Sequence, residues 1–77
     1  MIHKKLKQIM AKTFDIKESQ IGNDSSITNV ENWDSLSHLR LIVAIEEGFS
    51  IKIDEQEIIH MNCYSSIVKL LKKKGIS

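Results

Sequence analysis

Apolar residues recur at helical spacing along much of the chain, and one long stretch lacks that spacing. Over residues 2–14 they return every three or four positions with lysines between them, which predicts an amphipathic first helix. Over residues 15–33 the periodicity fades into Ser, Asn and Asp, with isolated apolar residues at Ile16, Ile21, Ile27 and Val30. We expect these residues to anchor a long loop onto the rest of the molecule.

Capping residues mark the starts of two later helices. Asp34 and Ser35 are of types favoured at helix N-termini, so we expect a second helix from there to about Glu47, where a glycine follows. The Asp-x-x-Glu spacing of residues 54–57 is that of a capping box, and it predicts a short third helix that ends near Met61.

A fourth helix is expected after Asn62, which is suited to cap it. Its buried side should be formed by Tyr64, Ile67, Val68 and Leu71. Lysines fill its last turn and Gly75 follows, which suits the helix dipole and a C-terminal glycine cap. No segment alternates convincingly as a strand, and the nearest is 49–53. The sequence therefore predicts an all-α fold: a small four-helix bundle with a long first loop and a short third helix, formed by residues 1–77 as a single domain.

Size and composition exclude several functional classes. With 77 residues the chain suffices for one small domain but has little room for a deep catalytic pocket, so we do not expect an enzyme. Its longest apolar run, residues 41–45, is far shorter than the roughly 20 residues that span a membrane. The single cysteine, Cys63, cannot form an internal disulfide. These features fit a soluble cytoplasmic protein, with a monomer as the default state.

The net charge of +1 hides a segregation of charge along the chain. Residues 1–12 and 58–77 each carry four lysines and no acid. The middle, residues 13–57, holds all ten acids against three bases. A partner that approaches the middle of the chain should therefore meet a negative field.

The second predicted helix has two apolar faces. At about 100° per residue, the face suited to the core gathers Leu41, Ile42, Ile45 and Phe49. The nearly opposite face gathers Leu36, Leu39 and Val43, together with Arg40 and Glu47. A small bundle has difficulty burying both, so the second face should either dock into a partner's groove or be covered by the long loop.

Ser35 opens this helix, where a serine most often serves only as a cap. Its hydroxyl could also carry a phosphate group, because the unpaired amides and the positive dipole end of a helix N-terminus stabilise anions. The position of Ser35 alone is compatible with both interpretations.

Three short motifs follow one another around this helix. Asp34-Ser35-Leu36 opens it, Ala44-Ile45-Glu46-Glu47-Gly48-Phe49 ends it, and Ile51-Lys52-Ile53 follows. Together they closely resemble the Asp-Ser-Leu motif, the Ala-Leu/Ile-Glu-Glu-x-Phe stretch and the apolar-x-Ile segment of the acyl carrier proteins. The tripeptide alone is a weak signal, but its distance from the downstream stretch, in a chain of this length, makes the match specific. The resemblance covers nearly the whole chain and implies the acyl-carrier type of four-helix bundle.

The resemblance implies that Ser35 receives 4′-phosphopantetheine from coenzyme A through a separate phosphopantetheinyl transferase (holo-ACP synthase). The arm would end in a thiol that holds acyl or aminoacyl groups as thioesters. It would present them to acyl-loading and acyl-transferring enzymes of lipid metabolism, including fatty acid biosynthesis, or of specialised-metabolite biosynthesis. The second helix would be the main docking surface, through Asp34, Leu36, Leu39, Arg40, Val43 and Glu47.

The chain also departs from the family pattern. Carriers of bulk fatty-acid synthesis are usually strongly acidic, whereas Ser37 and Arg40 stand here where such carriers generally have acids. Residues 30–33, Val-Glu-Asn-Trp, replace the usual glycine before the motif, and the missing Gly-Gly argues against a peptidyl carrier domain. We therefore expect a stand-alone specialised carrier with its own partner enzymes.

Other chemistry in the sequence is weaker. His38 lies three residues after Ser35, but a hydrolase would also need an orienting acid, an oxyanion hole and a pocket. We expect a helix histidine that lies near the prosthetic group or is part-buried beside Leu41. His60 and Cys63 have metal-ligand spacing but no second pair, so we expect no metal site and interpret Cys63 as a small buried hydrophobe.

Two alternative functions stay open. The chain could be an unmodified helical protein-interaction module that keeps the apolar docking face, or a small nucleic-acid-binding domain that uses the second helix for recognition. The acids around that helix would repel phosphates, so we expect no nucleic-acid partner. Trp33, beside the motif, is expected to be buried as a plug under the loop.

Overall fold

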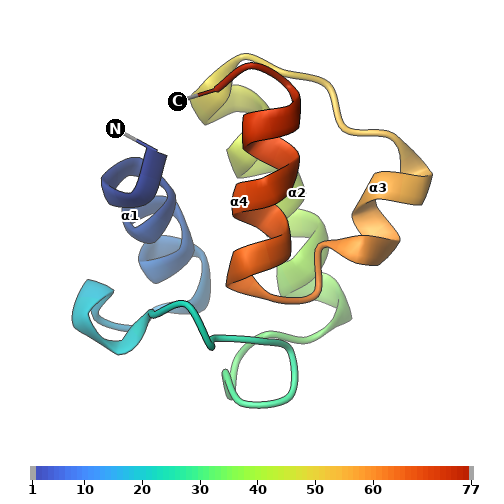
Figure 1. Cartoon of the computed structure of the whole chain (residues 1–77). Helices are drawn as coiled ribbons and strands as arrows, with labels where there is room; N and C mark the ends of the chain where they lie inside the picture. Colours follow the sequence, from blue (N-terminus) through green and yellow to red (C-terminus); the bar gives the residue numbers. More distant parts are fainter. Residues whose placement is uncertain (1, 77) are drawn as a thin grey trace.

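The structure is a computed structural model that describes residues 2–76 (Figure 1). These residues form four α-helices and one short 3-10 helix: α1 Ile2–Phe14, η1 Glu18–Gln20, α2 Ser35–Phe49, α3 Glu55–His60 and α4 Tyr64–Lys73. Within 2–76 there is no β-strand, and Ser26 and Cys63 make a single antiparallel bridge. The predicted all-α fold, with its long first loop and short third helix, is confirmed.

One hydrophobic core joins the helices. Helix α1 packs against both α2 and α4, while α3 lies on the far side of the molecule from α1 (Figure 1). The largest fully buried side chains are Leu6, Met10, Phe14, Leu41, Ile45, Met61, Tyr64, Ile67 and Leu71. All four residues expected on the inner side of α4 are buried, because their spacing places them on one stripe of the helix.

The long loop between α1 and α2 is held down, but not by every expected anchor. Ile21 and Val30 are buried and Ile16 is half-buried, whereas the side chain of Ile27 is 43% exposed. The expectation for Ile27 was wrong because the backbone does the anchoring there. Its N–H donates to the Asn62 carbonyl at 3.0 Å, which ties the loop to the start of α4 and leaves the side chain outside.

Helix α2 runs two residues beyond its expected end at Glu47. Gly48 does not stop the helix, and a Cβ placed on it would lie 2.8 Å from Cδ1 of Ile9. The glycine therefore allows α1 and α2 to approach closely. The helix ends at Phe49, and Ser50 follows in the left-handed conformation (φ 56°), with its N–H donating to the Glu46 carbonyl.

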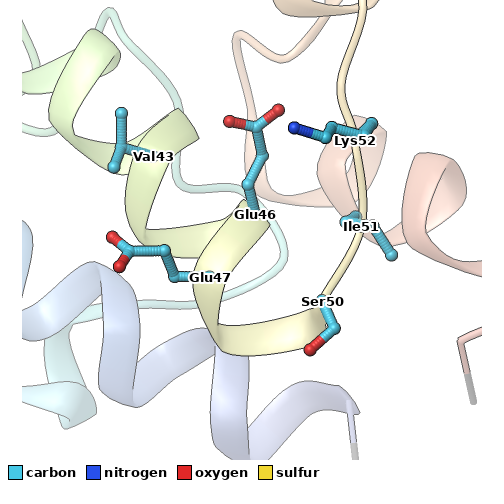
Figure 2. A pocket seen from close by; sticks show the side chains of 6 residues that line it. All are labelled: Val43, Glu46, Glu47, Ser50, Ile51 and Lys52. Atoms are coloured by element: carbon cyan, nitrogen blue, oxygen red, sulfur yellow. The ribbon is translucent and has the colours of Figure 1, made fainter.

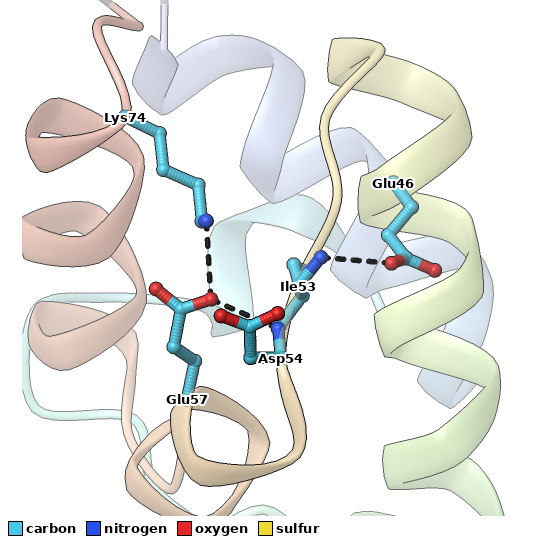
Figure 3. Close-up of polar contacts among 5 residues, drawn as sticks. All are labelled: Glu46, Ile53, Asp54, Glu57 and Lys74. Carbon is cyan, nitrogen blue, oxygen red and sulfur yellow. Dashed lines mark hydrogen bonds and ion pairs between the residues drawn. The ribbon is translucent and has the colours of Figure 1, made fainter.

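The segment between α2 and α3 is held by polar contacts on both sides (Figure 3). Glu46 of α2 accepts the Ile53 N–H at 2.9 Å through Oε2. The predicted capping box of α3 is present: the Asp54 N–H donates to Glu57 at 2.9 Å, and Glu57 pairs with Lys74 at 3.0 Å. Two contacts lower the pKa of the Glu57 carboxyl. The hydrogen bond from the Asp54 N–H has the larger effect, and the contact with Lys74 comes second. Helix α3 is thereby connected to the end of α4.

The start of α4 differs from the prediction by one residue. Cys63, not Asn62, is the N-cap, because the Asn62 carbonyl is used by the loop. In that position Cys63 is half-buried and not fully buried as expected, and the nearby hydroxyls of Ser65 and Ser66 lower the pKa of its thiol. At the other end, Gly75 takes a positive φ of 89°, so the predicted glycine cap is confirmed.

Candidate functional site

Ser35 is the first residue of α2, and its side chain is exposed. The start of α2 lies at the end of the molecule that the long loop crosses, the lower end in Figure 1. The N-cap is Asp34, whose Oδ1 accepts the Ser37 N–H at 2.9 Å. Since Asp34 makes the cap, the interpretation of Ser35 as a simple N-cap is wrong, and its hydroxyl is available for other chemistry.

The cap at Asp34 leads to a prediction about acid stability. The backbone N–H of Ser37 favours the ionised carboxylate and lowers the pKa of Asp34 from its ordinary 3.8. The ionised Asp34 cap therefore makes its full contribution to the free energy of unfolding above pH 3.8, the ordinary pKa. That contribution is lost as the pH falls through the lower pKa of the folded state. Asp34→Asn keeps an acceptor oxygen that does not titrate.

We expect the free energy of unfolding of the original protein to fall relative to that of Asp34→Asn as the solution is acidified below about pH 4. Urea denaturation of both proteins over a pH series measures this difference. Parallel pH profiles would contradict the lowered pKa.

Trp33 and His38 flank Ser35 on the inner side of the site. Trp33 is only 3% exposed and packs on Phe14 with ring centroids 5.0 Å apart, so the expected plug is confirmed. Its indole Nε1 donates to Nδ1 of His38 at 3.0 Å, and Nε2 of His38 lies 3.0 Å from the Ile58 carbonyl. Both ring nitrogens are occupied, so this histidine is not placed to take the Ser35 proton.

The outward face of α2 is exposed along its length. Leu36, Leu39 and Val43 are 60%, 58% and 53% exposed. On the opposite face, Leu41, Ile42 and Ile45 are buried and Phe49 is half-buried. Arg40 and Glu47 are also exposed. The loop does not cover the outward face, so the expected exposure is confirmed and the alternative of a covered face is wrong. We call Leu36, Leu39 and Val43 the α2 apolar stripe.

A surface hollow continues the α2 apolar stripe at its far end (Figure 2). It is lined by Val43, Glu46, Glu47, Ser50, Ile51 and Lys52. Val43 belongs to both the stripe and the hollow, and Lys52 extends towards Glu46. The stripe and the hollow therefore form one surface, which offers apolar side chains together with the carboxylates of Glu46 and Glu47 from the acidic middle of the chain.

Two kinds of feature are absent from residues 2–76. In that range there is no group of three or more His, Cys, Asp or Glu side chains arranged to hold a metal ion, and the His60 and Cys63 spacing gains no further ligand. No helix in the same range is long and apolar enough to cross a membrane.

The geometry fits a covalently bound phosphate on Ser35. The exposed hydroxyl stands at the positive end of a helix of 15 residues, where a phosphate would face solvent and the first-turn amides. Asp34 adds a negative charge beside it, although its carboxylate is turned to the Ser37 N–H. A long group attached to Ser35 would begin outside the core, next to the α2 apolar stripe.

Comparisons with known proteins find similarity over nearly the whole chain. A family model described as "Phosphopantetheine attachment site" matches residues 4–71. The acyl carrier protein of Buchnera aphidicola subsp. Baizongia pistaciae (strain Bp) is 38% identical over 72 residues, which cover 94% of this chain and 92% of that protein. The acyl carrier protein of Borreliella burgdorferi (strain ZS7) is 33% identical over 73 residues, which cover 95% of this chain and 91% of that protein.

Proposed function

Because this chain belongs to the acyl carrier protein family, whose cofactor is 4′-phosphopantetheine, we propose that Ser35 is the attachment point of that arm. The observation that supports this most is the exposed Ser35 hydroxyl at the start of α2, left available because Asp34 caps the helix. When bound, the group supplies a thiol that holds acyl or aminoacyl cargo as a thioester. The 1–77 domain then acts as a cytoplasmic, monomeric carrier.

The carrier depends on a separate enzyme for its own modification. In the transfer, the Ser35 oxygen would bond to the phosphorus next to the pantetheine of coenzyme A, the pyrophosphate P–O bond would break with release of adenosine 3′,5′-bisphosphate, and a base must take the Ser35 proton. The histidine nearest along the chain, His38, uses both ring nitrogens in other contacts. The site is also an open surface and not an enclosed pocket. The base and the coenzyme A site are therefore supplied by a phosphopantetheinyl transferase, and this chain is not itself an enzyme.

Partner enzymes are proposed to dock on α2. The α2 apolar stripe offers area that is exposed in the free protein, and Asp34, Arg40 and Glu47 surround it with charge. Acyl-loading and acyl-transferring enzymes would use the same face in turn, because it adjoins the attachment point. Arg40 is a base at a position where carriers of bulk fatty-acid synthesis generally have an acid. This difference favours a pathway-specific set of partners in lipid or specialised-metabolite biosynthesis.

The test is incorporation of the prosthetic group. Incubation of the purified protein with a phosphopantetheinyl transferase and coenzyme A is expected to add the mass of one phosphopantetheine, measured by intact-mass spectrometry. An unchanged mass with several competent transferases would overturn the carrier function and favour an unmodified interaction module.

Charge reversal tests the docking face separately. Glu47→Lys places a positive charge on the exposed side of α2, whereas Lys73→Glu makes the matched change on the exposed side of α4. We expect Glu47→Lys to slow association with the transferase roughly tenfold at low salt, and Lys73→Glu to have a much smaller effect. Stopped-flow association rates at two salt concentrations measure both. Equal effects would contradict α2 as the interface.

A further inference from the structure

His38 connects three parts of the structure that lie around Ser35. Its Nδ1 accepts the indole N–H of Trp33 at 3.0 Å, and the two rings stack with centroids 6.1 Å apart at 25°. Its Nε2 lies 3.0 Å from the Ile58 carbonyl of α3, and its backbone N–H donates to the Asp34 carbonyl at 2.8 Å. The His38 side chain, which belongs to the first turn of α2, therefore contacts both the end of the loop, through Trp33, and α3, through Ile58. We call the Trp33–His38–Ile58 contacts the histidine link.

The partners of the histidine link fix the tautomer of His38. An indole nitrogen can only donate a hydrogen bond, so Nδ1 of His38 must be unprotonated in order to accept it. A backbone carbonyl can only accept, so the ring proton must be on Nε2, which donates to Ile58. A single neutral tautomer satisfies both contacts, and the ring is held from both sides.

The histidine link joins the two ends of the short segment that carries Ser35, from Trp33 to His38. Of the two residues before the serine, Trp33 is tied to the His38 side chain, whereas the Asp34 carbonyl accepts the ordinary helical hydrogen bond from the backbone N–H of residue 38. Trp33 is itself fixed in the core against Phe14. The backbone on either side of Ser35 therefore has little freedom to turn, although the hydroxyl remains exposed.

We propose that His38 is a positioning residue for attachment of the prosthetic group, acting through Trp33 and the first turn of α2. This inference rests on the proposed function of Ser35. The ring nitrogens of the histidine contact Trp33 and Ile58 and not the Ser35 hydroxyl. It holds the turn so that the Ser35 hydroxyl is presented in one orientation, and a misplacement of about 1 Å can cost a transfer reaction up to a hundredfold in rate. The α2 apolar stripe, which would bind the transferase, is made of other side chains. A substitution of His38 therefore leaves the stripe itself unchanged.

The test compares three variants in steady-state transfer of phosphopantetheine from coenzyme A. His38→Leu removes both contacts at similar volume, Trp33→Phe removes the indole donor together with part of the buried ring, and His38→Gln can still accept and donate through its amide. We expect His38→Leu and Trp33→Phe to lower kcat on the order of tenfold with KM within about twofold. His38→Gln should recover most of the loss.

Controls separate positioning from general destabilisation. Ile67→Val in the core of α4 is a mild destabilising change far along the chain from Ser35, and it should leave kcat unchanged. If Ile67→Val lowers kcat as much as His38→Leu at matched stability, or if folded His38→Leu and Trp33→Phe keep the original kcat, the proposal is overturned. Should His38→Leu fail to fold, Trp33→Phe and His38→Gln carry the same comparison.

A spectroscopic measurement tests the link without any enzyme. Nitrogen-15 NMR of the imidazole is expected to show the Nε2–H tautomer in the original protein, and an Nδ1–H tautomer would overturn the proposal. If the original protein is never modified by a transferase, the function of Ser35 fails, whereas the tautomer measurement still reports on the link alone.

Discussion

Ser35→Ala is expected to abolish phosphopantetheine incorporation completely while the protein stays folded. The substitution removes the hydroxyl oxygen that would form the phosphodiester, and no binding energy can replace a missing bond-forming atom. Folding should be little affected because the Ser35 side chain is exposed and Asp34 makes the helix cap. Intact-mass spectrometry after treatment with transferase and coenzyme A measures the modification, and far-UV circular dichroism measures the helix content.

Ser37→Ala is the matched control for this prediction. Ser37 is the next serine along α2, two residues on. Its backbone N–H, which alanine retains, makes the cap hydrogen bond to Asp34, and only the smaller contribution of its hydroxyl to the lowered pKa of Asp34 is lost. Ser37→Ala should therefore be modified like the original protein. Modification of Ser35→Ala, or loss of modification in Ser37→Ala with normal folding, would contradict Ser35 as the attachment point.

Two leucines of α2 should separate folding from partner binding. Leu41 is fully buried, whereas Leu39 is 58% exposed on the α2 apolar stripe. Leu41→Ala should lower the free energy of unfolding by about 3–5 kcal/mol, since it removes buried methyl groups and leaves a cavity. A domain of this size has a total stability on the order of 4–12 kcal/mol, so such a loss brings it close to unfolding. Leu39→Ala should change stability by less than about 0.5 kcal/mol.

Partner binding should show the reverse order. Leu39→Ala truncates an exposed contact beside Ser35, and we expect it to raise the KM for the transferase several-fold at unchanged stability. Urea denaturation and steady-state kinetics of both variants measure the two effects. A large loss of stability in Leu39→Ala would mean that the outward face is packed in solution, and it would contradict the docking role.

Residues with strict periodicity were predicted well because helical geometry alone decides which way they face. Leu36, Leu39 and Val43 recur at positions that leave the core side of α2, and all three are exposed. The capping box at Asp54 and Glu57 was predicted for a similar reason, since it involves residues only three apart. Ser35 as the attachment point stays a prediction.

Features that depend on distant parts of the chain were not predictable. Whether Gly48 ends a helix or fits a crossing depends on where Ile9 lies, 39 positions earlier, and the sequence does not contain that distance. The same holds for Ile27, whose backbone is tied to Asn62. The histidine link was missed because Trp33 and His38 are five apart across a helix start, a spacing without a regular pattern, and its third member is on α3.

The burial of Trp33 gives this protein a built-in optical reporter. It is the sole tryptophan of the chain and stands two residues before Ser35, with its indole N–H bonded to an imidazole. In the purified protein, fluorescence excited in the indole band therefore comes from one place, so the forms with and without a loaded arm can be compared without an attached dye. Emission intensity should respond to events at this end of the molecule, and a shift to longer wavelength should mark exposure of the indole to water.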